Sequence, residues 1–299
     1  IEYDGSHSYF RAYLVGLLNT ILVSVIGIVF ATIIGVVVGI ARLSKNYLIE
    51  RTAAVYVEFF RNIPLLLQIF FWYFAALRAL PLPEKAEPML GVFFLTIKGF
   101  FVPAFVWNNL DIFIYSIIAA IISIFFVRLY AKKKQENQGI QTPVLLISIG
   151  LLVVLPLLSF LIGGAEAYVE IPVIKQLSQS SFTYEGGLKL PPELISLALA
   201  LSLYTATFIA ENVRAGVQGV SKGQKEAAAS IGLTPNQILK LVVMPQALRI
   251  IIPPTTNQYL NLTKNSSLAA AIAYPDLVLI FAGTALMQTG RAIEIVSIT

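Results

Sequence analysis

Two sets of polar side chains interrupt long apolar stretches of the sequence. The first set lies in the run 55–77 and the second in the run 250–273; in order, the members are Glu58, Arg61, Gln68, Asn257, Asn261 and Lys264. Their spacings of three, four and seven residues place the members of each set on one face of a helix. Ionisable groups deep in an apolar segment are costly unless they are paired or face water. The two faces therefore predict a shared aqueous cavity that could hold a polar solute.

A purely structural role for the same charges is the alternative. Glu58 could neutralise Arg61, which follows it by three residues. Lys264 could donate to backbone carbonyls left free near Pro253 and Pro254, because a proline has no N–H to offer them. The sequence leaves both roles open.

No residue pattern typical of a catalytic centre stands out. The sequence contains neither a G-x-x-x-x-G-K-[ST] phosphate loop nor an H-E-x-x-H zinc pattern. Cysteine is absent, which excludes thiolate metal ligands, thiol nucleophiles and disulfides. The one histidine, His7, precedes the first apolar run, and we expect it to be solvated. We therefore expect no enzymatic activity, no metal site and no cofactor.

Composition indicates that most of the chain is solvated by lipid. Hydrophobic residues make up 57% of the 299 residues and charged residues only 12%. Long uncharged runs predict membrane-spanning helices, because a lipid-exposed backbone must satisfy its own hydrogen bonds. We expect an all-α integral membrane protein that forms one domain over residues 1–299, a fragment whose last helix is cut. The expected spans are 13–41, 55–77, 111–130, 143–162, 193–209 and 250–273, with the start of another near residue 293.

Basic residues orient these spans. The loop that contains Lys45, the cluster Arg128–Lys134 and the polar segment 214–249 all lie on one side of the membrane in this arrangement. An excess of lysine and arginine marks the cytoplasmic side, so the first helix is expected to start outside. The same distribution explains the net charge of +5 without a nucleic-acid partner.

Small residues recur every four positions along the first span, at Gly27, Ala31, Gly35 and Gly39. They form a ridge of small side chains on one helical face. In membranes such a face lets two backbones approach closely, so we expect it to pack tightly against another helix.

The most specific pattern lies in the segment 214–249. Residues 226–232 read Glu-Ala-Ala-Ala-Ser-Ile-Gly, and after a spacer of nine residues 242–245 read Val-Val-Met-Pro. The alanines predict a helix, Gly232 predicts its end, and Thr234-Pro235 predicts the start of a second helix. A short exposed helix of small residues can lie closely in a groove of a partner. Glu211 and Arg214, three residues apart at the start of this segment, are expected to steady it.

This pattern resembles the EAA loop of ABC importer permeases, in which Glu-Ala-Ala, three residues, Gly, nine residues and Ile-x-Leu-Pro follow one another; Val242 and Met244 are the departures. Four further stretches resemble the polar amino acid (HisM/GltJ-like) branch of these permeases: 57–68, 209–216, 245–249 and 264–268. With its extra pair of spans within 111–162, the chain is most similar to the broad-specificity L-amino-acid or glutamate/glutamine/aspartate/asparagine permeases. The resemblance implies a type I ABC importer (MetI-like) transmembrane domain with an inserted helix pair, in the bacterial inner membrane.

The family resemblance also implies partners. In the family the short helix lies in a cleft of the ATPase subunit; the implied coupling residues are Glu226, Ala227, Ala228, Gly232 and Pro245. A dimer of ATPase subunits would hydrolyse ATP, a second permease subunit would complete a heterodimer, and a periplasmic amino-acid-binding protein would deliver substrate. The chain would lie in the lipid membrane as a multi-pass subunit.

A zwitterionic amino acid would suit the two polar sets. Arg61 and Lys264 could bind its carboxylate, and Glu58 could bind its ammonium group. An ion-coupled secondary carrier of amino acids is the alternative function. The charges inside the spans favour that alternative, whereas the coupling pattern opposes it.

Overall fold

The computed structural model describes residues 8–108, 110–139, 142–162, 167–178, 181–291 and 293. His7 and the span expected from residue 293 onward lie outside these residues. The chain divides into two compact units, which we describe separately. Unit 1 comprises Ile1–Ala86, Leu95–Phe100 and Leu190–Thr299, and unit 2 comprises Glu87–Phe94 and Phe101–Lys189.

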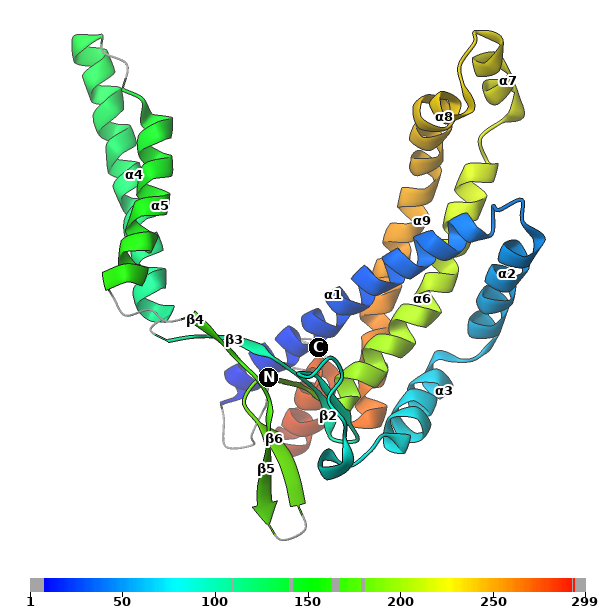
Figure 1. Ribbon diagram of the computed structural model, residues 1–299, viewed down its shortest axis with the longest axis horizontal. Coiled ribbons are helices and arrows are strands. Elements are labelled where there is room, and N and C mark those ends of the chain that lie inside the picture. Colours follow the sequence, from blue (N-terminus) through cyan, green and yellow to red (C-terminus); the bar gives the residue numbers. More distant parts are fainter. Residues whose placement is uncertain are drawn as a thin grey trace. The chain divides into compact units, whose positions relative to one another are not determined.

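Helices make up most of unit 1 (Figure 1). In chain order they are α1 (Tyr9–Ala41), α2 (Tyr47–Asn62), α3 (Leu65–Phe70), η1 (Phe71–Ala76), η2 (Leu77–Ala79), η3 (Pro83–Lys85), α6 (Pro192–Gln218), α7 (Lys222–Ser230), α8 (Pro235–Gln237), η4 (Ile238–Val243), α9 (Met244–Asn265), η5 (Ser266–Ile272), η6 (Val278–Ala285) and α10 (Leu286–Thr289). Side chains mark where the first two begin: Ser8 accepts from the N–H of Arg11, and Asn46 accepts from the N–H groups of Leu48 and Ile49.

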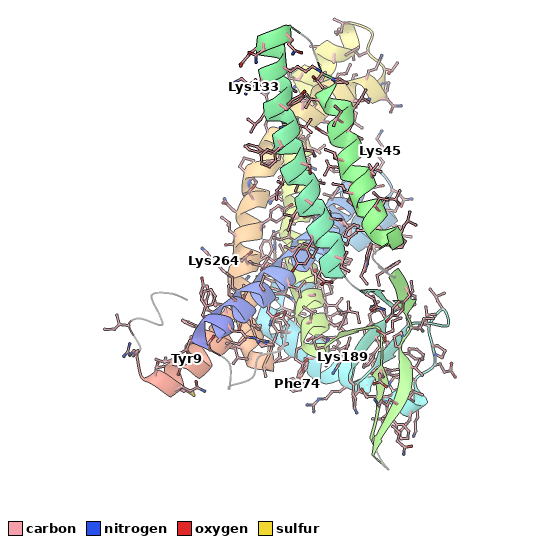
Figure 2. All side chains as sticks on the ribbon, turned by 90° about the vertical axis from the view of Figure 1, so that its left-hand side faces the viewer. Tyr9, Lys45, Phe74, Lys133, Lys189 and Lys264 are labelled. Carbon is pink, nitrogen blue, oxygen red and sulfur yellow. The ribbon has the colours of Figure 1, made fainter. Side chains whose placement is uncertain are left out.

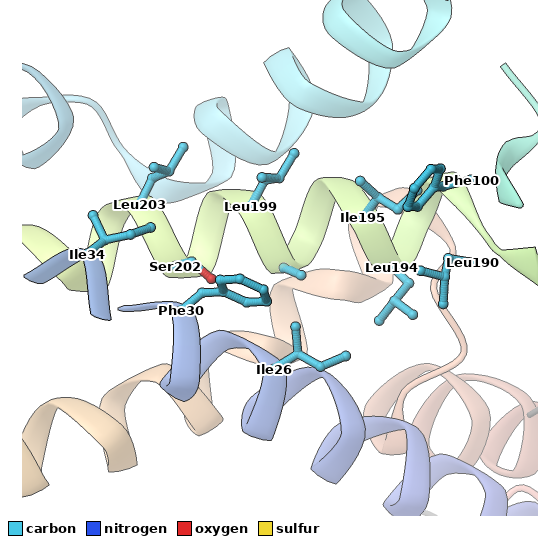
Figure 3. A pocket seen from close by; sticks show the side chains of 11 residues that line it. Ile26, Phe30, Ile34, Phe100, Leu190, Leu194, Ile195, Leu199, Ser202 and Leu203 are labelled. Carbon is cyan, nitrogen blue, oxygen red and sulfur yellow. The ribbon is translucent and has the colours of Figure 1, made fainter. Parts of the chain in front are cut away.

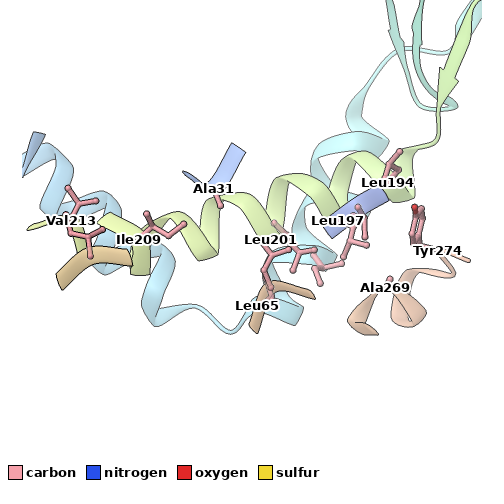
Figure 4. Packing of buried hydrophobic residues seen from close by; sticks show 14 of the residues in the cluster. Ala31, Leu65, Leu194, Leu197, Leu201, Ile209, Val213, Ala269 and Tyr274 are labelled. Carbon is pink, nitrogen blue, oxygen red and sulfur yellow. The ribbon is translucent and has the colours of Figure 1, made fainter. Parts of the chain in front are cut away.

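The small residues of α1 pack against α6 and α9, as the sequence predicts. Gly27, Ala31, Gly35 and Gly39 are all buried. A Cβ at Gly35 would lie 2.6 Å from the Cβ of Ile209, and a Cβ at Gly39 would lie 2.8 Å from the carbonyl oxygen of Ala210. Figure 4 shows the buried side chains that surround this contact, spread along the length of α6. The prediction of a tightly packed helix pair is confirmed.

The helix expected over 55–77 is not continuous, because it breaks at Pro64. A proline disfavours helical backbone at the residue that precedes it. Ile63, which precedes Pro64, is accordingly extended at φ −93° and ψ 125°. As a result α2 and the helical stretch Leu65–Ala79 differ in direction by 100°. The amide of Gln68 donates to the carbonyls of Phe60 and Ile63 at 2.8 and 2.9 Å, which satisfies backbone groups left free by the break.

Several other helices extend beyond the expected spans. Helix α6 continues to Gln218 rather than ending near 209, and the segment expected as a loop to 249 is itself mostly helical. Within the described residues, five helices are long and apolar enough to cross a membrane, and the bent pair formed by α2 and Leu65–Ala79 would add a sixth. The structure therefore has the length and apolar character that a multi-pass membrane protein needs.

Unit 2 combines a helical hairpin with short strands. Its helices α4 (Leu110–Gln138) and α5 (Val144–Ile162) pack side by side and share a hydrogen bond of 3.1 Å between Ser159 and Ser116. Most of their apolar side chains are exposed, which suits contact with lipid. Among the strands, β3 (Ala104–Trp107) pairs antiparallel with β4 (Ala167–Glu170), and β5 (Val173–Ser178) pairs antiparallel with β6 (Ser181–Glu185).

Three more strands lie where the chain passes between the units. They are β1 (Phe94–Thr96), β2 (Gly99–Val102) and β7 (Leu188–Leu190), hydrogen-bonded in that order. The sequence does not predict these strands. Each strand is only three to six residues long, and most of them pair with partners far along the chain.

Gly39→Ala tests the close approach of α1 and α6. Alanine favours a helix interior over glycine by about 1 kcal/mol, but its Cβ would collide with the backbone of Ala210. We expect crowding to dominate and to lower the stability by about 1–3 kcal/mol. Thermal unfolding of the solubilised protein measures this, with Val37→Ala on the exposed side of α1 as the control. An unchanged Tm for Gly39→Ala would contradict the packing.

Candidate functional site

The segment after α6 folds as the helix, turn and helix that the sequence predicts. Helix α7 ends at Gly232, which has φ +84°. The N–H of Leu233 donates to the carbonyl of Ala228 at 3.2 Å, and the N–H of Gly232 donates to that of Ala229 at 2.9 Å. This pair of bonds is a Schellman motif, which closes a helix C-terminus. Thr234 then begins α8 with a capping box, and Pro235 occupies the first turn.

Most of the surface of helix α7 is exposed. Glu226 and Ala227 are exposed, whereas Ala228 is buried and α7 packs on η4. Among the described residues the carboxylate of Glu226 makes no ion pair. Pro245, the last residue of the expected coupling set, lies exposed in the first turn of α9. These positions leave one face of α7 free to enter a groove.

A charge cluster ties the end of α1 to α6 close to α7. The carboxylate of Glu211 bonds both the guanidinium of Arg42, just beyond α1, and that of Arg214. Arg214 also donates to Gln218 Oε1 at 2.6 Å. The sequence predicts that Glu211 and Arg214 act together but does not predict the contact with Arg42, whose only signal in the sequence is its place in a basic loop. The cluster therefore links α1 to the last turns of α6, from which α7 follows.

Residues 219–223 fit the letters of the G-x-S-x-G nucleophile turn of hydrolases, but their setting differs. That turn joins a strand to a helix, whereas here it joins α6 to α7. Ser221 is exposed and lies at the N-cap of α7, and no histidine occurs among the described residues. The described part of the chain also contains no group of three or more His, Asp or Glu side chains that could bind a metal ion.

The first polar set is divided by the break at Pro64. Glu58 and Arg61 are exposed on α2, whereas Gln68 is 4% exposed and engaged with the backbone. The guanidinium of Arg61 lies over the ring of Phe208, 4.8 Å from its centre. No ion pair joins Arg61 to Glu58 among the described residues. Mutual neutralisation of the two charges therefore gains no support.

The second polar set remains intact on α9. Asn257, Asn261 and Lys264 are all exposed at helical spacing. The carbonyls freed by Pro253 and Pro254 lie about 20 Å from Lys264 along the helix axis, which is beyond the reach of a lysine. Figure 2 shows Lys264 at a level between Lys45 and Phe74. Lys264 is thus placed partway along the unit with no described ion-pair partner.

The structure does not bring the two polar sets together within one chain. Helices α2 and α9 each pack against α6, which runs between them in Figure 1. A cavity of about 240 Å³ does lie between α1 and α6, and Figure 3 shows the side chains that line it. Its lining is apolar except for Ser202, whose hydroxyl faces the carbonyl of Gly27 at 3.5 Å. Such a cavity does not suit a charged solute.

Comparisons with known proteins agree with this architecture. Residues 139–295 match the family described as "Binding-protein-dependent transport system inner membrane component". Over its whole length the chain is 49% identical to the general L-amino acid transport system permease protein AapQ of Rhizobium johnstonii and covers 73% of it. Over 98% of its length it is 39% identical to the glutamate/glutamine/aspartate/asparagine transport system permease protein BztB of Rhodobacter capsulatus and covers 75% of it.

One solved structure shares the fold. It is a crystal structure of an amino acid ABC transporter with histidines, similar at a TM-score of 0.54 and 18% identity. The match covers 97% of this chain and 85% of the other. The helical, multi-pass fold class is confirmed.

Glu211→Gln tests the charge cluster. Losing the carboxylate leaves Arg42 and Arg214 close together without a counter-ion, so we expect stability to fall by about 1–3 kcal/mol, allowing for partial solvent screening. The double variant with Arg42→Gln should regain part of this loss, because interacting residues are not additive. Unfolding midpoints of the four forms measure the coupling; purely additive effects would contradict a direct pair. Glu84→Gln, an exposed change in η3, serves as the control.

Proposed function

Because the chain belongs to the family of binding-protein-dependent transport system inner membrane components, we propose that it is the permease subunit of an ABC importer that moves polar L-amino acids across the bacterial inner membrane. The observation that carries this function is its near full-length similarity to amino-acid permeases. The exposed, Schellman-capped helix α7 at the end of α6 supports it.

The substrate class follows from the relatives. The names of AapQ and BztB specify L-amino acids in general and glutamate, glutamine, aspartate and asparagine. We infer that the present chain carries a similarly broad set of polar L-amino acids. An ion-coupled secondary carrier would have no use for α7, so the importer is favoured.

The importer requires partners that supply energy and substrate. The sequence contains no phosphate-loop pattern, so we infer that a dimer of separate ATPase subunits hydrolyses ATP. A periplasmic binding protein would deliver the amino acid. A second permease subunit, different from this chain, would complete the membrane pathway.

Movement of the ATPase subunits would reach the spans through α7. Helix α7 packs on η4, which leads directly into α9, and it follows from α6 by a short turn. Because Glu211 bonds Arg42, a shift at the end of α6 also moves the end of α1. We infer that Glu226, Ala227 and Gly232 present α7 to the ATPase, while buried Ala228 holds α7 on η4, and Pro245, exposed in the first turn of α9, continues the connection.

The substrate passage is proposed along the exposed polar faces of α2 and α9. Glu58, Arg61, Asn257, Asn261 and Lys264 remain candidates, because each is exposed on a helix proposed to cross lipid. Exposed charges there are favourable only beside water or a partner. The second permease subunit would close the passage over them. Gln68 does not belong to this passage, since its amide caps the broken helix.

Gly232→Val tests the coupling role. Valine at φ +84° carries a strain of about 1–2 kcal/mol, enough to reduce the population of the native turn about five- to thirtyfold. No heavy atom lies within 4 Å of the added Cβ, so the effect is on the turn alone. We expect uptake to fall in proteoliposomes that contain all subunits, while assembly persists.

The matched control for this variant is Gly223→Ala. Gly223 also has open space around its Cβ but does not have positive φ. Alanine there should be neutral or slightly stabilising. Normal uptake by Gly232→Val, or an equal loss in both variants, would count against the coupling assignment.

Lys264→Gln tests the passage. If Lys264 holds the substrate carboxylate, its loss removes a charge-assisted contact of about 1.5–3 kcal/mol, or about ten- to a hundredfold in apparent affinity. Abundance in the membrane should not change, because the side chain is exposed and makes no described ion pair. Uptake kinetics measure the effect, with Lys45→Gln as the control. An unchanged KM would exclude Lys264 from substrate binding.

A further inference from the structure

A second cavity, which unlike the first contains charged side chains, lies at the end of unit 1 opposite α7. It has a volume of about 400 Å³, within the range of small-molecule sites. It is lined by residues from the end of the bent helix pair, from the turn between β1 and β2 and from the first turn of α6: Tyr73, Leu77, Arg78, Ile97, Pro192 and Glu193. Helix α6 has 27 residues and is therefore about 40 Å long, so this cavity and α7 lie on opposite sides of a membrane.

The cavity holds two opposite charges that do not pair with each other. Arg78 and Glu193 both line it, yet neither forms an ion pair, with N to O up to 4.0 Å, among the described residues. Opposite charges at an exposed site gain little from direct contact. Here they flank a common space that is large enough for a small molecule.

Each charge is held in place by an aromatic side chain. The guanidinium of Arg78 lies 5.1 Å from the centre of the Phe74 ring, a cation–π contact. The hydroxyl of Tyr73 donates to Oε1 of Glu193 at 3.0 Å. Glu193 also lies in the first turn of α6, where the helix dipole favours a negative charge. Both side chains are therefore held in position along the wall of the cavity.

The remaining lining residues are apolar. Leu77, Ile97 and Pro192 offer no side-chain hydrogen bonds and no charge. A ligand in this cavity could be recognised by one cationic and one anionic group, but its other substituents would meet only apolar contacts. The chemistry favours a molecule that carries an ammonium and an anionic group a few bonds apart.

We propose that this cavity is an outer vestibule subsite that binds the α-carboxylate of an incoming amino acid through Arg78 and its α-ammonium group through Glu193. The proposal rests on the proposed importer function, which places this end of α6 in the periplasm. Because the subsite binds only the backbone charges that all amino acids share, it accepts substrates irrespective of their side chains. A phosphoethanolamine headgroup of a lipid carries the same pair of charges, and the test separates the two sources.

Protection of a single thiol measures occupancy of the cavity directly. The chain has no cysteine, so Ile97→Cys places one thiol in the cavity wall of the assembled transporter in lipid nanodiscs. L-glutamine at ten times its Kd leaves about a tenth of the sites empty, so labelling by a charged maleimide should slow about tenfold. N-acetylglutamine and glutaminamide, each of which lacks one backbone charge, should not protect. Leu82→Cys, exposed and outside the cavity, should label at one rate throughout.

Charge variants decide whether protection is local. Arg78→Gln and Glu193→Gln should each abolish protection of the Ile97→Cys thiol, whereas Lys85→Gln and Glu84→Gln, outside the cavity lining, should preserve it. The proposal would be overturned if protection survived in both cavity variants. It would also be overturned if about 10 mM glutamine, a concentration suited to a Kd near 1 mM, gave no protection. Protection by phosphoethanolamine but not by glutamine would assign the cavity to a lipid headgroup. Uptake by the same preparation separates failure of this subsite from failure of the importer function.

Discussion

The close approach of α1 and α6 is the constraint on which the rest of unit 1 depends. Lipid offers no hydrophobic driving force for two helices to associate, so contact relies on van der Waals packing between closely placed backbones. The ridge from Gly27 to Gly39 supplies this packing, and Leu262 of α9 fits against Gly27 in the same row. One strip of small residues thus fixes the relative positions of three helices.

This packing makes α6 a rigid connection between the two functional ends of the unit. At one end the Arg42–Glu211–Arg214 cluster binds the end of α1 to the turns that lead into α7. At the other end Glu193 enters the polar cavity beside Tyr73. In the proposed importer, a displacement of α7 would therefore be transmitted by packed backbones rather than by flexible loops. This is the property that an ATP-driven importer requires of its permease subunit.

Local signals in the sequence predict more of this structure than long-range pairings do. The alanine run, Gly232 and Thr234-Pro235 specify the α7 turn through backbone preferences alone, and the glycine ridge specifies one packed face. Pro64 also signals the break that divides the first polar set, but the apolar run around it favours the expectation of one continuous span. Arg42 with Glu211 and Arg78 with Glu193 are more than a hundred residues apart, so only the folded chain brings them together. Strands β2, β3, β4 and β7 depend on partners distant in the sequence in the same way.

The account depends most on contact between α7 and an ATPase subunit. A photo-crosslinking residue at Ala229, on the exposed part of α7, tests this in the assembled transporter. We predict a covalent product with the ATPase subunit whose yield changes on addition of ATP, and no such product from the same residue placed at Leu82. A transport-competent complex in which Ala229 never crosslinks to the ATPase would contradict the account.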